Sequence, residues 1–159
     1  GLLDLGIAFA PSVLEETELG PILEERLVFV ASRKHALADR PVLRMVELAG
    51  VPLVLLRREY STRRLIEEYM AKVGVEPEVA CETNSIDLMR GLAGTSSLAT
   101  IMPESSVESL PSLCILPIVD PEPVRTSALL WSRHKFRSLA ARTFAQIVRD
   151  RFASSKPMD

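Results

Sequence analysis

The sequence predicts an α/β fold, and two observations support this fold class. Hydrophobic residues make up 47% of the chain but aromatic residues only 5%, so the core must consist mainly of aliphatic side chains, as in a sheet covered by helices. Short apolar runs also alternate along the chain with segments of helical periodicity. A length of 159 residues suits one ordinary domain or two small lobes.

The predicted strands are short and mostly apolar. Several are continuous apolar runs, a pattern typical of parallel strands that are covered on both faces. The runs lie at 3–9, 27–31, 53–56, 78–82, 98–102, 114–119 and 127–131. The full predicted order is strand, strand, helix, strand, helix, strand, helix, strand, helix, strand, strand, helix.

Helix caps and one-sided apolar patterns mark the first helices. Over 62–73 the apolar side chains fall on one face, and Gly74 follows as the usual left-handed stop. Asn84 or Ser85 can cap a second helix, in which Asp87 adds negative charge near the N-terminus.

Two further helices are predicted near the C-terminal half of the chain. Pro103 suits the first position of a helix, and Glu104 after it suits the same end. The last helix is predicted over 138–152. Its apolar side chains are expected to be buried: Leu139, Phe144, Ile147, Val148 and Phe152.

The charge balance argues against nucleic acid as a direct partner. With 19 basic and 21 acidic residues the formal net charge is −2, whereas a DNA-binding domain normally carries a basic face. One local basic cluster is interpreted mostly as solvated surface. Its members are Arg57, Arg58, Arg63 and Arg64. The sequence has no signal-peptide pattern and no apolar stretch near the roughly 20 residues of a membrane helix, which predicts a cytoplasmic protein without a membrane partner.

No catalytic constellation is present in the sequence. It lacks a G-x-S-x-G elbow, a P-loop and a G-x-G-x-x-G turn. His35 and His134 are isolated, and Cys81 and Cys114 lack the spacing of a zinc site. We therefore expect no catalytic residue, no metal and no cofactor, and a binding module rather than an enzyme.

Small polar residues gather instead where strands meet helices. Ser61 with Thr62 and Asn84 with Ser85 follow predicted strands, and Ser97 precedes one. A helix N-terminus presents backbone N–H groups and partial positive charge, which favour a small anion. In open α/β sheets, ligands also collect outside the carboxyl ends of the strands. The alternative is that these side chains are ordinary helix caps.

Four segments resemble the effector-binding domain of LysR-type transcriptional regulators in sequence and order. They are LLDLGIAFAP, LGPILEERLVFVASRKHALA, TRRLIEEYMAKVG and SSLATIMPES, and the resemblance runs over about 3–152. It implies two lobes of the type II periplasmic-binding-protein kind, with a small-molecule effector between them. By this resemblance lobe I is 1–30 plus 131–159 and lobe II is 31–130, with crossing strands near 28–31 and 127–131.

Family members carry a further strand, helix and strand before the segment LLDLGIAF, and an N-terminal winged helix-turn-helix before these. Neither has a counterpart here, so the resemblance predicts a chain truncated at its N-terminus. It implies that DNA is bound only through the absent helix-turn-helix, and that the full-length protein is a homodimer or homotetramer.

Within the family, EYSTRRLIEEY, ETNSIDLM and GTSSLATIMP are most similar to regulators of cyanate-utilisation operons. This similarity implies a small anion, such as cyanate, as the effector. The residues predicted to bind it come from both lobes: Phe9, Ala10, Pro11, Ser61, Thr62, Asn84, Ser85, Ser97 and Pro103.

Two other functions remain open on this scaffold. The first is a periplasmic solute-binding protein. The second is an enzyme such as an acyl or amine transferase, which would need a nucleophile or a cofactor lysine in the cleft. Lys34 and Lys72 are the only lysines before the last segment, and Lys72 falls on the charged face of its predicted helix.

Overall fold

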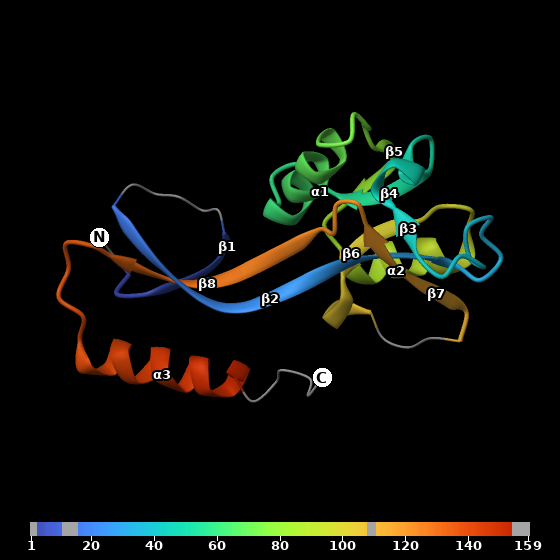
Figure 1. The fold of residues 1–159 in the computed structure, drawn as a ribbon. Helices are drawn as coiled ribbons and strands as arrows, with labels where there is room; N and C mark the ends of the chain where they lie inside the picture. The colour runs from blue at the N-terminus through green and yellow to red at the C-terminus, as the bar shows by residue number, and fades with distance from the viewer. Residues whose placement is uncertain (1–2, 11–15, 108–110, 154–159) are drawn as a thin grey trace. The chain divides into compact units, whose positions relative to one another are not determined.

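The computed structural model describes residues 3–10, 16–107 and 111–153 (Figure 1). The chain divides into two compact units, one formed by Gly1–Glu24 with Arg125–Asp159 and the other by Glu25–Val124. The predicted α/β class is confirmed. The lobe boundaries derived from the resemblance remain a prediction. Within the described residues no helix is long and apolar enough to cross a membrane.

The sheet of the second unit is organised around residues 25–32 of β2 (Thr17–Ser32), a 16-residue strand whose first half belongs to the other unit. It pairs antiparallel with β6 (Thr100–Pro103) and β7 (Leu113–Val119). The short strand β3 (Leu43–Arg44) adds to β7 in parallel.

Both faces of β2 are buried between Leu27 and Ala31. Because strand side chains alternate between faces, Leu27, Phe29 and Ala31 enter one hydrophobic cluster, and Val28 and Val30 enter another. The continuous apolar run therefore reflects burial on both sides, as predicted. The pairings of β2 with β6 and β7 are nevertheless antiparallel, unlike the parallel arrangement expected for such runs.

A second, two-stranded sheet pairs β4 (Pro52–Leu56) with β5 (Glu78–Thr83) in parallel. Helix α1 (Ser61–Ala71) follows β4 and α2 (Ile86–Thr95) follows β5, and both pack on β4 (Figure 1). Gly74 has the predicted left-handed conformation, with φ of 71°.

The first unit contains β1 (Gly6–Ala10), which pairs antiparallel with β8 (Val124–Ser132), and helix α3 (Leu139–Ala153). Its core is small. The cluster consists of Leu129, Trp131, Ala141 and Ala145, with Leu5 and Ile22 packed against it.

Two predicted helices are single 3₁₀ turns. The one before β4 spans Met45–Leu48, and the one after β6 spans Glu104–Ser106. Pro103 is therefore the last residue of β6 rather than the first of a helix, because its backbone pairs with Leu27 in the sheet.

The burial predicted for α3 is wrong for four of the five side chains, and Val148 is half-buried. Leu139, Phe144 and Ile147 are 72%, 50% and 60% exposed, and Phe152 is also exposed. The helix packs on its unit through Ala141 and Ala145, which lie four residues apart on one face. The periodicity correctly indicated a helix, but among the described residues the packed face is formed by small side chains rather than by the larger apolar ones.

We expect the double substitution of Phe144 and Ile147 by Lys to change the free energy of unfolding by less than about 1 kcal/mol, since neither side chain is buried. The exposed apolar face should bind a hydrophobic dye such as ANS, and the variant should lose most of that fluorescence. Urea unfolding and dye titration check the two expectations. Substantial destabilisation by the variant would show that another surface covers this face in solution.

Candidate functional site

The first element of the candidate site is the junction between β4 and α1. The strand ends at Leu56, and the helix begins at Ser61 after the loop 57–60. Tyr60 is the N-cap residue without a side-chain capping bond, and its carbonyl oxygen accepts the Arg63 N–H at 3.1 Å. Ser61 and Thr62 are therefore the first two helical residues and not the N-cap, half-buried and buried respectively.

The second element is the junction between β5 and α2. Ser85 is the N-cap residue, and its Oγ accepts the Leu88 N–H at 3.2 Å. The Ser85 N–H in turn donates to Oγ1 of the buried Thr83 at 3.1 Å. Asn84 between them is exposed. The sequence allowed either Asn84 or Ser85 as the N-cap of α2, and in the structure the N-cap is Ser85.

The register of the parallel strands brings these junctions together. Leu56 pairs with Thr83, and the Arg57 N–H donates to the Thr83 carbonyl oxygen at 3.1 Å. Both helix N-termini consequently lie at the carboxyl edge of the β4–β5 sheet, where their partial positive charges add. With the exposed Arg57 nearby, this edge is suited to holding a small anion.

Replacing Ser85 with Ala should lower the free energy of unfolding by about 1 kcal/mol, because the Leu88 N–H loses its capping acceptor. Ser61 is the matched control, since it makes no capping bond in α1 and its replacement by Ala should cost clearly less. Urea denaturation of both variants measures the difference. Equal losses would contradict the assignment of Ser85 as the cap.

Two more predicted residues lie around β6. Ala99 forms a parallel bridge with Leu53, near the start of β4, so the exposed Ser97 lies at the amino edge, away from the junctions. From this bridge β6 runs in the direction of β4, which carries the buried Pro103 toward the carboxyl edge. The structure therefore does not bring Ser97 together with Ser61 and Ser85.

The remaining predicted residues belong to the first unit. Phe9 and Ala10 lie in β1, where they pair with Ser127 and Thr126. The guanidinium of Arg125 lies 4.3 Å from the centroid of the Phe9 ring, a cation–π contact. Pro11 lies outside the described residues.

The interpretation of the basic cluster as mostly solvated surface is confirmed, with one buried exception. Arg57, Arg58 and Arg64 are exposed, but Arg63 is only 1% exposed and bonds to Leu56, Glu67 and Glu82. Its position was available from the sequence, because residues 63, 66 and 70 share one helical face and the latter two are apolar. Thr83, whose oxygen atoms accept the N–H groups of Arg57 and Ser85, was also not among the predicted site residues.

The cysteines and histidines do not converge on the junctions. Burial raises the pKa of the Cys114 thiol, which keeps it protonated, and desolvation lowers the pKa of His35. Among the described residues, no three His, Cys, Asp or Glu side chains are placed to hold a metal ion.

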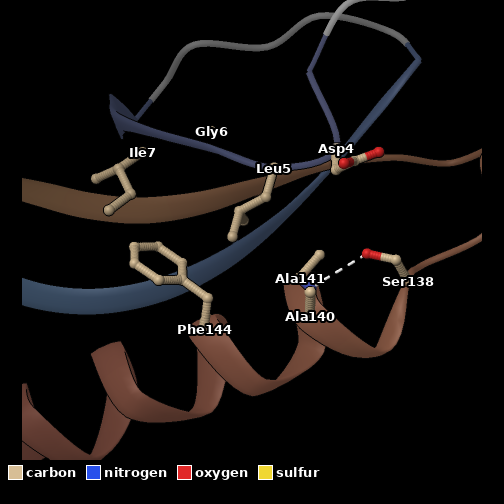
Figure 2. Close-up of a pocket in the computed structure, with 8 residues that line it drawn as sticks. All are labelled: Asp4, Leu5, Gly6, Ile7, Ser138, Ala140, Ala141 and Phe144. Atoms are coloured by element: carbon tan, nitrogen blue, oxygen red, sulfur yellow. Dashed lines mark hydrogen bonds between the residues drawn. The ribbon is translucent and has the colours of Figure 1, made fainter.

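An open groove of about 370 Å³ lies within the first unit. Figure 2 shows Phe144 of α3 facing Leu5 and Ile7 across it, while Oγ of Ser138 accepts the Ala141 N–H at 3.2 Å. The lining is mostly apolar, so this groove lacks the donors of the β4–β5 edge. The full lining comprises Asp4, Leu5, Gly6, Ile7, Ser138, Ala140, Ala141 and Phe144.

Solved structures share this fold. The effector-binding domain of QuiR in complex with shikimate has a TM-score of 0.83 and 22% identity, covering 95% of this chain and 72% of that one. The regulatory domain of CcmR from Synechocystis PCC6803 in complex with 2-PG has a TM-score of 0.82 and 23% identity, covering 98% and 74%. The fold is thus the type II periplasmic-binding-protein-like fold of such domains.

Sequence comparison extends this result to the family. A probable nitrogen assimilation transcriptional activator of Synechococcus elongatus is 28% identical over 156 residues, which cover 94% of this chain and 50% of the relative. The chain therefore spans about half the length of this relative. The family model described as the LysR substrate binding domain matches residues 1–153. A match over nearly the whole chain shows that it belongs to the family of LysR substrate-binding domains.

Proposed function

We propose that this chain is the ligand-sensing domain of a LysR-type transcriptional regulator, and that it binds a small anionic effector at the carboxyl edge of β4 and β5. The observation that carries the proposal is the convergence of two helix N-termini there, joined by the bond from Arg57 to Thr83. Ser61, Thr62, Asn84 and Ser85 contribute the polar side chains, and Arg57 contributes positive charge. None of these groups is a nucleophile activated by a base.

The proposed mechanism is a shift between two states of the regulator. An effector changes an equilibrium only when it binds the two states unequally. In the full-length protein this change would reach DNA through a helix-turn-helix domain in a homodimer or homotetramer. We place such a regulator in the cytoplasm, where its DNA lies. The curated relative named above is a transcriptional activator, which favours this function over a solute-binding protein.

Cyanate is our first choice of effector. It is small, linear and singly charged, and helix N-termini lined by hydroxyl and amide groups suit such an ion. The resemblance of the junction segments to cyanate-operon regulators supports this choice. An enzymatic function lacks comparable support, because Lys72 lies at the C-terminal end of α1 with its Nζ 4.0 Å from the centroid of the Tyr69 ring.

A thermal-shift titration of this chain tests the proposal. The ligands are cyanate, azide, bicarbonate, sulfate and benzoate at matched ionic strength. A ligand at about a hundred times its Kd should stabilise the fold by about 2.7 kcal/mol, which raises the Tm by about 5–10 °C for this chain length.

A selective shift with cyanate or azide that Asn84→Ala weakens would support the proposed site. Gln146→Ala is the control, because it removes an exposed side-chain amide in α3, in the other compact unit, without changing the charge. A shift with benzoate alone would overturn cyanate as the effector but keep the sensing function. No shift with any small anion would overturn the proposed ligand class.

A further inference from the structure

Arg63 is a buried cation whose hydrogen bonds reach three separate parts of the fold. Its side chain is 1% exposed. Its Nη1 donates to the Leu56 carbonyl oxygen at 2.8 Å and to Glu82 Oε1 at 2.9 Å, and its Nε donates to Glu67 Oε1 at 2.9 Å. A guanidinium withdrawn from water needs such partners, because an unpaired buried charge is strongly unfavourable.

The acceptors of Arg63 stand next to both junctions of the candidate site. Leu56 is the last residue of β4, directly before the loop that leads to α1. Glu82 lies in β5, two residues before Asn84. Glu67 lies one helical turn beyond Arg63 in α1 itself. One side chain thus fixes the end of β4, the first turns of α1 and the end of β5.

The geometry of the guanidinium is needed for this linkage. Its planar fork directs N–H groups along several fixed directions, whereas a lysine ammonium on a flexible stem cannot hold the same set of acceptors. Glu67 and Glu82 are 26% and 46% exposed at their side chains, so both keep part of their hydration. A buried ion-pair cluster can often be replaced by apolar side chains of similar volume without loss of folding stability.

We infer that Arg63 is a positioning residue for the effector site. It holds the N-terminus of α1 and the end of β5 at the spacing at which their donors converge on one ligand. Arg63 does not itself contact the ligand, because its N–H groups are engaged with protein acceptors. The inference rests on the proposed function for its ligand, but the positioning can be measured without one.

The test compares Arg63→Lys with Arg64→Lys in the whole chain. Arg64 is the matched control because it is the neighbouring arginine of α1, is exposed, and donates from its side chain to the Glu59 carbonyl oxygen at 3.3 Å, within the same loop and helix. Arg63→Lys keeps the charge but removes the fork. Arg63→Met is added because it removes the buried charge together with the guanidinium, whereas Arg63→Lys removes the guanidinium alone.

Amide hydrogen exchange measured by NMR is the first readout. In Arg63→Lys the amides of Arg57 and Ser85, one at each junction, should exchange at least about tenfold faster, while that of Val54 inside β4 keeps its rate. Both junction amides bond to Thr83, and the Val54 N–H bonds to the Ala99 carbonyl oxygen. Equal acceleration of all three amides would indicate general destabilisation and overturn the inference, as would unchanged rates.

The second readout is the affinity for potassium cyanate by calorimetry at a temperature at which every variant is folded. We expect Arg63→Lys to raise the Kd at least about tenfold, since preorganisation is lost, and Arg64→Lys to leave it unchanged. An unchanged Kd in Arg63→Lys would overturn the inference. If the unsubstituted chain does not bind cyanate, the proposed ligand is wrong, and the exchange rates alone decide the role of Arg63.

Discussion

Replacing Phe29 with Ala is expected to lower the free energy of unfolding by about 3–5 kcal/mol. The side chain is 0% exposed in the C-terminal half of β2, in the largest hydrophobic cluster of the described residues. Its backbone is paired on both sides, with Ile101 of β6 and Leu116 of β7, so the strand cannot move to fill the cavity. Domains of this size have a total stability of only about 5–15 kcal/mol, so the variant should be close to unfolding.

Urea denaturation followed by circular dichroism measures this loss. Phe136→Ala is the matched control, because Phe136 is 86% exposed and the same truncation there should change stability by less than about 0.5 kcal/mol. Comparable losses in the two variants would contradict the assignment of Phe29 to the core.

Replacing Ser61 with Asp should separate stability from ligand binding. A carboxylate in the first turn of α1 interacts favourably with the helix N-terminus, so stability should rise by about 0.3–1 kcal/mol. The same negative charge occupies the edge at which we place the anion. We expect affinity for cyanate to fall at least about tenfold, because two like charges at close range repel.

Ala140→Asp is the control for this experiment. It adds an equal charge to the first turn of α3, in the other compact unit, and should leave anion affinity unchanged. Thermal denaturation and calorimetric titration of both variants give the two quantities. If Ser61→Asp bound cyanate as tightly as the unsubstituted chain does, the anion would have to lie elsewhere.

The elements that the sequence predicted well depend on local interactions. The apolar face of α1 and the stop at Gly74 involve residues within a few turns of one another, and so does the cap of α2, which the sequence limited to Asn84 or Ser85. The short 3₁₀ turns after β3 and β6 were predicted as helices. For the turn after β6, the pairing that confines Pro103 to the sheet comes from the distant Leu27.

The same distinction applies to the candidate site. Ser61, Thr62, Asn84 and Ser85 were predicted at one edge, and the parallel register of β4 and β5 places them there. Ser97 was grouped with them as another small polar residue beside a predicted strand, but the bridge from Ala99 to Leu53 puts it at the opposite edge. Strand register joins residues far apart in sequence, and no local pattern specifies it.

The exposed face of α3 illustrates a further limit. A one-sided apolar pattern predicts a helix with a face suited to burial, but it does not predict which surface covers that face. Within the described residues the helix uses Ala141 and Ala145 instead. Arg63 shows the converse, since its acceptors on β4 and β5 could not be read from a charged residue in a basic segment.

The burial of β2 on both faces affects how its alignment with its neighbours is selected. In a strand with one solvent-exposed face, a shift of the pairing by one residue turns the apolar side chains toward water, so the shifted register is unfavourable. Between Leu27 and Ala31 such a shift would only exchange one apolar set for another, so polarity discriminates little. Side-chain volume must do so instead. Phe29, the only aromatic residue in this run, would be forced into the second cluster, in the space that Val28 and Val30 occupy. The size of Phe29 therefore selects the register of the strand.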